Sequence, residues 1–347
     1  MDVRLSPEQV TLRDAARQVV DRLCPRTVAE FDDAERAGKL DAAVVASGWL
    51  ELRTASDDGR PWATGVEVAV VAEELGRGLA DTAFLGPTMA ADLRRLVGAS
   101  PASTPETIAL SADLSQPAVA RGGAVDRGAV AVDARGATSA LVLLPDGDGY
   151  TIGAIALGSS TTGVDLTRPV VSCPPGAAVS ALEGQRRPLG ADDLSRWRAL
   201  GLAVTCADLV GVMRGAVTVT CDYARSRRQY GAAIGSFQAV QHLLADAYVA
   251  AEGSASIALH AAWAVDALDD PDALEAASAA KAYCTRAARS VCETAIQVHG
   301  GIGNTWECLA HVFLRRALLS VDVLGGVGAN LARVLAAHGI GGDDGLR

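Results

Sequence analysis

Two short stretches in the C-terminal half of the sequence carry residue types that could hold a negatively charged ligand. The first is Arg227-Arg-Gln-Tyr-Gly-Ala-Ala-Ile-Gly-Ser-Phe-Gln238, and the second is Gln297-Val-His-Gly-Gly-Ile-Gly303. The guanidinium of Arg227 could donate a fork of N–H groups to a phosphate. Adjacent glycines leave backbone N–H groups open to the close approach of an anion. A diphosphate would suit both stretches together, whereas either one alone is read more easily as a solvated arginine or a helix-ending glycine pair.

A helix must lead into the second stretch. Small apolar residues recur at steps of three and four between residues 273 and 298, which predicts a helix with one narrow packed stripe. Asp270 is a plausible N-cap of this helix, with Pro271 at its first position. The pair Gly300-Gly301 ends it.

Changes in hydrophobic periodicity and in β-prone residues divide the chain into three regions. Residues 1–99 read as a helical domain that starts at Ser6-Pro7, a typical helix-start pattern. Residues 100–190 read as a reduced β-rich domain of short strands, and residues 191–347 as a helical bundle. We therefore predict an α+β fold. The β-prone runs are Thr107–Leu110, Ala129–Val132, Ala140–Leu144 and Tyr150–Ile155, with a turn at Pro145–Gly149.

Composition disfavours several kinds of partner. The 347 residues carry a formal net charge of −10, and a nucleic-acid backbone would need clustered Lys and Arg instead. No run of about 18 uncharged apolar residues and no secretion signal is evident, so we expect no membrane span. Seven cysteines without a C-x-x-C pair favour reduced thiols and a cytoplasmic location. No His, Cys or Asp spacing suggests a metal site.

In this order, the two stretches resemble the acyl-CoA dehydrogenase family. Its pattern R-x-Q-[FY]-G…F-Q is followed some sixty residues later by Q-[VI]-x-G-G-x-G, as in this chain. The resemblance extends to Leu5-Ser-Pro-Glu-Gln9, to Gly48-Trp-Leu50 and to the stretch Val-Ala-Glu-Glu-Leu-Gly-Arg that ends at Arg77. It implies an N-terminal helical domain, a central β-domain and a C-terminal four-helix bundle.

The resemblance also implies an activity. Family members remove the α-proton of an acyl-CoA thioester with a carboxylate, pass a hydride to FAD, and release electrons to an electron-transferring flavoprotein. In that family, the two stretches grip the ADP half of FAD across a dimer interface, and the resemblance implies the same role here. The positions that match are Arg227, Tyr230, Gln238, Gln297, Gly300 and Gly301.

Two departures from the family pattern concern the catalytic base. Most members carry a glutamate after an R-D-A near the C-terminus, and aligning the Arg-Arg-Ala that ends at Ala317 places Leu324 at that position. A minority place the base on the helix that leads into the first stretch, where counting back from Arg227 gives Gly201. Neither residue can accept a proton. The flavin-ring motifs T-E-x-x-x-G-S-D and W-I-[TS]-[NG] are also missing between residues 100 and 185.

A chain with half of a flavin site resembles the non-catalytic subunit of actinobacterial heteromeric acyl-CoA dehydrogenases. These assemble as α2β2 tetramers, and several of them act on sterol side chains. The resemblance implies that FAD is shared across the subunit interface and that a catalytic homologue supplies the ring pocket and the glutamate. The acyl-CoA itself cannot be named from the sequence.

Two alternatives stay open. One is a homomeric enzyme whose base lies elsewhere, although its candidates are more easily read as solvated or helix-capping carboxylates. The other is a flavin-free assembly or regulatory protein on the same fold. The candidate carboxylates are Asp192, Asp193 and Asp322. His299 could contact the cofactor or pack at a helix end. His242 reads as a surface or interface residue, and nothing in its spacing makes Glu307 a base.

Overall fold

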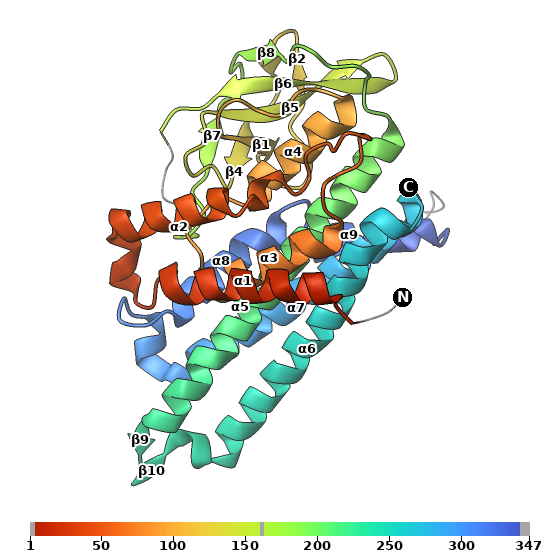
Figure 1. Cartoon of the computed structure of the whole chain (residues 1–347). Coiled ribbons are helices and arrows are strands. Elements are labelled where there is room, and N and C mark those ends of the chain that lie inside the picture. The colour runs from red at the N-terminus through yellow and green to blue at the C-terminus, as the bar shows by residue number, and fades with distance from the viewer. Residues whose placement is uncertain (1–3, 160–162, 341–347) are drawn as a thin grey trace.

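The computed structural model describes residues 4–159 and 163–340 and places a sheet at one end of a long helical bundle (Figure 1). Helices come first along the chain, then the sheet, then helices again, as the sequence predicts. The first helices lie across the bundle beneath the sheet (Figure 1).

The N-terminal helices begin where their local sequence predicts. Ser6 Oγ accepts the N–H of Gln9 at 3.2 Å, and Gln9 Oε1 accepts the N–H of Ser6 at 2.9 Å, which forms a capping box. Pro7 takes the first position of that helix. The N-terminal elements are α1 (Pro7–Leu23), η1 (Val28–Asp32), α2 (Ala34–Ala46), η2 (Trp49–Glu51), α3 (Gly65–Arg77) and α4 (Leu85–Val97).

A six-stranded sheet with strand order β7-β4-β1-β5-β6-β8 forms the central region. β1 pairs with β5 in parallel, and its other partner β4 is antiparallel. The four predicted β-runs are confirmed as β1, β4, β5 and β6. The predicted turn at Pro145–Gly149 is shorter than expected, because Asp146 pairs with Gly149 inside the β5–β6 hairpin. The strands are β1 (Glu106–Ser111), β2 (Ala120–Arg121), β3 (Ala124–Val125), β4 (Ala129–Val132), β5 (Ser139–Asp146), β6 (Gly149–Ala156), β7 (Val171–Cys173) and β8 (Val179–Ala181).

The C-terminal bundle contains three long helices and two shorter ones. The predicted helix end at Gly300 is confirmed, but the predicted N-cap is shifted by one residue, since Asp269 precedes a helix that begins at Asp270. The elements are α5 (Ala191–Ser226), β9 (Arg228–Gln229), β10 (Ala232–Ala233), η3 (Ile234–Ser236), α6 (Gln238–Ala267), α7 (Asp270–His299), η4 (Gly300–Asn304), α8 (Ala310–Asp322) and α9 (Val327–Ala337).

α5 is the helix that ties the N-terminal region to the bundle. A Cβ on Gly211 would lie 1.9 Å from the carbonyl oxygen of Glu73 in α3, so only glycine permits this approach. The indole N–H of Trp197 donates to the carbonyl of Met89 in α4 at 2.9 Å. The first contact fixes the middle of α5 against α3, and the second fixes the start of α5 against α4, which sets the surroundings of Gly201.

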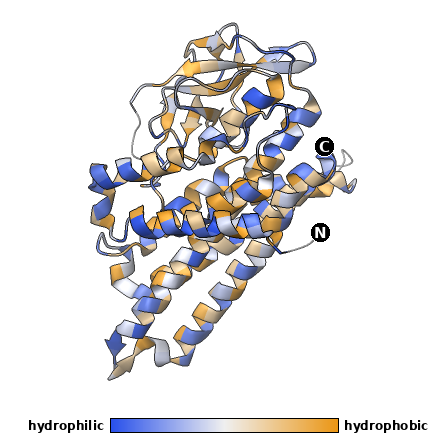
Figure 2. Cartoon of the chain, viewed as in Figure 1, coloured by the Kyte–Doolittle hydropathy of each residue, from blue (hydrophilic) through white to orange (hydrophobic). Residues whose placement is uncertain are grey.

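Hydropathy separates the interior of the bundle from its far tip. Figure 2 shows hydrophilic residues along β9 and more apolar ones along β10, in the hairpin that joins α5 to α6. Two segments, Ala191–Ser226 and Ala310–Ala337, are long and apolar enough to cross a membrane, and 78% of the relevant window of the first is buried in the protein. Core helices meet the same criterion, so the expected absence of a membrane span stays a prediction.

Candidate functional site

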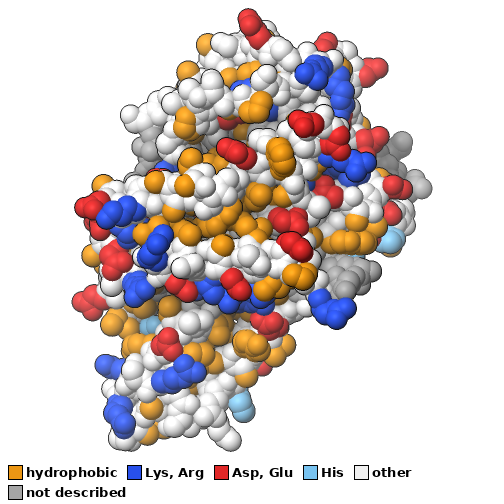
Figure 3. Space-filling view, viewed as in Figure 1, with side chains coloured by type: hydrophobic (Ala, Val, Ile, Leu, Met, Phe, Trp, Pro, Cys, Tyr) orange, Lys and Arg blue, Asp and Glu red, His pale blue; other side chains and the backbone are white. Residues whose placement is uncertain are grey.

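The two stretches singled out in the sequence lie at the same end of the bundle. The hydroxyl of Tyr223, in the last turn of α5, donates to the carbonyl of His299 at 3.4 Å. The two rings stack with centroids 4.4 Å apart. The Arg227 hairpin follows α5 directly, and the turn at Gly300 follows α7 directly. Lys and Arg side chains gather over this lower end of the molecule in Figure 3.

The backbone of Arg227 is hydrogen-bonded at both its N–H and its carbonyl, whereas its side chain has no partner in the described residues. Its N–H donates to Tyr223 at 2.8 Å, and its carbonyl accepts the N–H of Ile234 at 2.8 Å. The side chain is exposed, and its guanidinium has no hydrogen bond or ion pair within residues 4–159 and 163–340. A fixed backbone with an unpaired guanidinium suits the binding of an anion.

Tyr230 stands out because it is a 96% exposed aromatic residue at the tip of the hairpin. Its φ of 52° is uncommon for a residue with a side chain. Its one ring contact in the described part of the chain is an edge-on approach to Phe237, 6.4 Å between centroids. An aromatic ring presented in this way is typical of a surface that is covered in an assembly.

The turn at Gly300-Gly301 leaves its backbone without side chains that would cover it. Gly300 has φ 66° and ψ −143°, a conformation open to glycine alone in practice. A Cβ placed on Gly300 or Gly301 would meet no atom within 4 Å, so the turn is open to the close approach of a ligand, although the N–H of Gly300 itself donates to the carbonyls of Ile296 and Gln297. Gln238 and Gln297 are exposed beside these turns, and neither side-chain amide has a partner in the described residues. A diphosphate cofactor fits this set of unpaired donors.

His299 is a packing residue at this helix end. Its side chain is 7% exposed, and its Nδ1 lies 2.7 Å from the carbonyl of Ala295 one turn earlier. With its ring stacked on Tyr223, it joins α7 to α5. His242 is exposed, consistent with its interpretation as a surface or interface residue, and Glu307 is exposed as well.

The two positions expected for a catalytic carboxylate face each other. Leu324 is fully buried, and a Cβ on Gly201 would lie 2.4 Å from Leu324 Cδ1 and 2.8 Å from Met89 Cε. The side chain of Leu324 therefore occupies the space that a side chain at position 201 would need. The family motifs identify Leu324 and Gly201 as the two base positions, but they do not indicate that these two residues are in contact.

The turn that carries Leu324 is held from two sides. Its N–H donates to the carbonyl of Leu114 at 2.8 Å, so the loop that follows β1 closes directly onto it. The loop belongs to the region where the flavin-ring motifs are missing. On the other side, Lys281 Nζ donates to the carbonyl of Val323 at 2.8 Å and to that of Ser320. These bonds satisfy carbonyls at the end of α8 that the helix leaves unpaired.

Lys281 was not indicated by the sequence analysis. It is fully buried on α7, and burial lowers the pKa of its ammonium to about 8. The signal was present in the sequence as one lysine on a stripe of small apolar residues between Ala280 and Cys284.

The alternative carboxylates do not replace the missing base. Asp193 accepts two hydrogen bonds from Arg187, at 2.6 and 2.7 Å, and one from the N–H of Gly190 at 2.9 Å. Burial is the largest single influence and opposes its ionisation, but the hydrogen bonds from Arg187 and Gly190 and the charges of Arg187 and Arg95 together lower the pKa of Asp193. Asp192 and Asp322 are exposed to solvent. The described residues contain no cluster of His, Cys, Asp or Glu able to hold a metal, and all seven cysteines are unpaired thiols.

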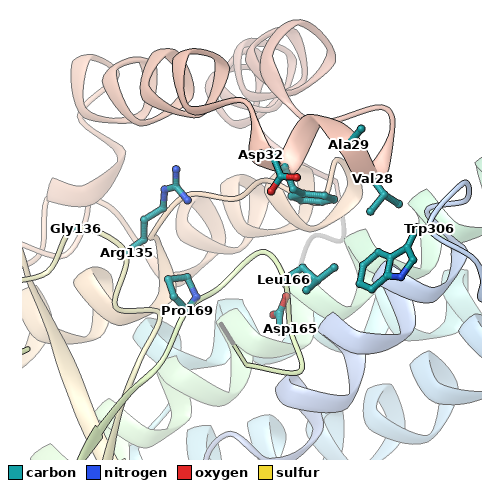
Figure 4. Close-up of a pocket in the computed structure, with 10 residues that line it drawn as sticks. Val28, Ala29, Asp32, Arg135, Gly136, Asp165, Leu166, Pro169 and Trp306 are labelled. Carbon is teal, nitrogen blue, oxygen red and sulfur yellow. The ribbon is translucent and has the colours of Figure 1, made fainter. Parts of the chain in front are cut away.

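A cavity of about 650 Å³ lies elsewhere, where the N-terminal region, the central region and the bundle meet (Figure 4). Trp306 and Leu166 face each other across it in Figure 4, with Val28 above them and Arg135 at the far side. Neither Leu324 nor any of the expected FAD-contacting residues lines this cavity. The sequence analysis did not anticipate it.

The fold and the two exposed motif stretches are those of a chain of the acyl-CoA dehydrogenase type. Residues 199–339 match the acyl-CoA dehydrogenase C-terminal domain. The chain is 30% identical over 274 residues to acyl-CoA dehydrogenase IpdE2 of Mycolicibacterium smegmatis, covering 78% of each protein. This chain belongs to the acyl-CoA dehydrogenase family.

Solved structures agree on the fold. The ChsE4–ChsE5 complex from Mycobacterium tuberculosis superposes with a TM-score of 0.80 at 22% identity, covering 98% of this chain and 99% of the compared chain. PigA, determined with FAD and proline, gives a TM-score of 0.77 at 17% identity, covering 99% of this chain and 100% of the compared chain. The predicted α+β architecture is confirmed.

Proposed function

We propose that this chain is one subunit of a heteromeric, FAD-dependent acyl-CoA dehydrogenase whose catalytic glutamate comes from a homologous partner subunit. The observation that carries the proposal is the contact between Leu324 and Gly201. Both base positions are apolar, and their space is filled. A chain without a carboxylate there has no group to remove the α-proton of a thioester.

The exposed end of the bundle supplies this chain's part of the cofactor site. Arg227 would pair with the diphosphate of FAD, and the backbone of Gly300 and Gly301 would approach the same group closely. Gln238 and Gln297 would donate to the adenosine or ribitol, and Tyr230 would be covered by cofactor or partner. Bound FAD supplies the hydride acceptor for the dehydrogenation.

The nature of the partner follows from what this chain lacks. It must carry a glutamate, a flavin-ring pocket and a complementary interface, which a full-length homologue has. The structural likeness to a ChsE4–ChsE5 complex supports a two-subunit arrangement. An acyl-CoA substrate, an electron-transferring flavoprotein as acceptor and a cytoplasmic location belong to the same proposal.

Purification of the chain alone and together with a catalytic homologue tests the proposal. Alone, the chain should bind little flavin by absorbance and should not oxidise an acyl-CoA. The pair should bind FAD and be active. If the chain alone is yellow and turns over a thioester, the missing-base argument is wrong. If the active pair retains full FAD occupancy after Arg227, at the β9–β10 hairpin, is replaced by alanine, the assignment of the cofactor contacts is wrong.

The two alternatives are less well supported. A homomeric enzyme would need a base among Asp192, Asp193 and Asp322, of which the first and last are exposed and the middle one is bound to Arg187. A flavin-free assembly protein would have no use for the unpaired Arg227 beside a bare glycine turn. A co-purified pair that bound no flavin would favour this second alternative.

A further inference from the structure

Two half-buried arginines flank the turn that carries Leu324. Arg198, on α5, donates to the side-chain carbonyl of Gln116 in the central region. Arg333, on α9, donates to Asn330 Oδ1 at 2.7 Å and to the carbonyl of Leu324 at 3.3 Å. Each guanidinium is thus held by a neutral amide side chain, which positions the group but leaves its charge uncompensated.

Most other buried and half-buried arginines in the described residues meet carboxylates. Arg315 is an exception, and it donates to the carbonyl of Val164 at 3.3 Å and lies over the Trp306 ring. Arg53 contacts Asp92 at 3.1 Å, Arg36 contacts Asp81 at 2.5 Å, and Arg316 contacts Asp208 at 2.6 Å. Arg198 and Arg333 have no ion pair within the described ranges. Burial lowers the pKa of Arg198 to about 10, with a further contribution from the charge of Arg333, and burial lowers the pKa of Arg333 as well.

The surroundings hold both guanidinium groups in place. Asn330 is fully buried, and its Nδ2 donates to Gly325 at 2.7 Å and to Gly326 at 2.9 Å. The two terminal nitrogens of Arg333 lie 3.6 and 3.7 Å from the position of a Cβ on Gly325. The Nε of Arg198 is buried and has no hydrogen-bond partner in the described structure. An unpartnered buried donor beside a second fixed cation is costly unless an anion accepts from it.

We infer that Arg198 and Arg333 bind a phosphate group at the junction of α5, α9 and the loop after β1. Two planar donor forks match the oxygens of a phosphate, and its double charge would compensate both cations. This site is distinct from the Arg227 end of the bundle, and the inference does not depend on the proposed flavin role. It explains why amides, instead of carboxylates, orient both arginines.

Thermal unfolding of the purified full-length chain in increasing inorganic phosphate tests the site, with chloride holding the ionic strength constant. The wild-type melting temperature should rise and saturate. Arg198→Gln and Arg333→Gln should each need about tenfold more phosphate or lose the response, because each removes charge-assisted hydrogen bonds. Arg127→Gln, an exposed arginine in the central region, should respond like the wild type.

Two further measurements keep the test decisive. Isothermal titration with phosphate should give a saturable signal for the wild type and for Arg127→Gln, and a much weaker one for the two site variants. Acetate at the same ionic strength should give a smaller response, since it carries one charge. An equal phosphate response in all variants, no response in the wild type, or an acetate response as large as that of phosphate overturns the inference.

Discussion

The two ends of the long helices in this protein have opposite characters. At the far end, Arg227, Tyr230 and the glycine turn are exposed and largely unpaired. Near the sheet, Leu324 and Gly201 are buried in contact with each other. In a family enzyme, both places would touch ligands. Here the first presents the groups that we propose to recognise a cofactor, whereas Leu324 and Gly201 at the second pack against each other, so substitutions at the two ends should affect different measurements.

The largest expected effect lies at the packed end. Leu324→Ala removes a fully buried side chain and leaves a cavity against Gly201 and Met89. We expect the free energy of unfolding to fall by about 3 kcal/mol. Denaturant unfolding of the chain measures this loss. A loss near zero would mean that the Leu324 contact is not a packed core, and the contrast between the two ends would fail.

A comparable effect should appear in the pH dependence of stability. Lys281 has a pKa of about 8 in the folded chain and 10.5 as its ordinary value, so between these values the unfolded chain binds more protons. Lys281 therefore contributes a rise in stability with pH across this window, by up to about 3 kcal/mol, and no change below it. The buried thiols of Cys24 and Cys292 contribute a fall in stability over the same range, because burial raises the pKa of each to about 12.

Unfolding curves at pH 8 and pH 10 compare the wild type with Lys281→Met, in which the rise contributed by Lys281 should be missing while the fall contributed by the cysteines remains. Lys39→Met provides the control, because Lys39 lies exposed on α2 in an ion pair with Glu35. If the rise persists in Lys281→Met, another group is responsible for it.

At the exposed end, the expected effect is on the cofactor. In the assembled pair, Arg227→Ala should weaken FAD binding by ~1.5–3 kcal/mol, about tenfold or more, because a charge-assisted contact to phosphate is lost. The unfolding free energy of the isolated chain should change by less than about 0.5 kcal/mol, since the side chain has no described partner.

Arg228→Ala is the matched control for that measurement, as Arg228 is the neighbouring exposed arginine outside the family motif. Equal losses of FAD affinity in the two variants would show a general electrostatic effect instead of a specific contact. A large loss of stability in Arg227→Ala would contradict the view that this end is built for binding.

The smallest expected effect is a coupling between the two base positions. Gly201→Ala alone should destabilise the chain by roughly 1 kcal/mol, because its new Cβ needs the space of Leu324. In the Leu324→Ala background, the same substitution should be neutral or favourable, which gives a coupling of about 1 kcal/mol in a double-mutant cycle. Gly38→Ala, on an exposed helix position with open space, should stabilise the chain.

Local sequence signals predicted much of the fold. Ser6-Pro7 placed the first helix start, the small-residue stripe placed α7, and Gly300 placed its end, because capping and periodicity act over a few residues. The shift of one residue at Asp270 reflects a cap that uses no side-chain hydrogen bond, so its identity leaves little trace in the sequence.

The candidate site was predicted only in part, for a physical reason. The exposed half of the candidate site could be predicted because its motif residues lie close together in the sequence. The contact of Leu324 with Gly201 and the hydrogen bond from Leu324 to Leu114 join segments distant in sequence, and no local pattern encodes them. The same holds for Arg198 and Arg333, whose missing carboxylates become visible only when their neighbours in space are known.

The filled contact at Leu324 also restricts how this chain could change. A glutamate introduced at position 201 would collide with Leu324 and Met89, so Leu324 must first become smaller. A glutamate introduced at position 324 would place a charge in a fully buried apolar setting. A carboxylate at position 201 therefore requires two substitutions in a set order, and the first of them, at position 324, costs stability before a base is gained.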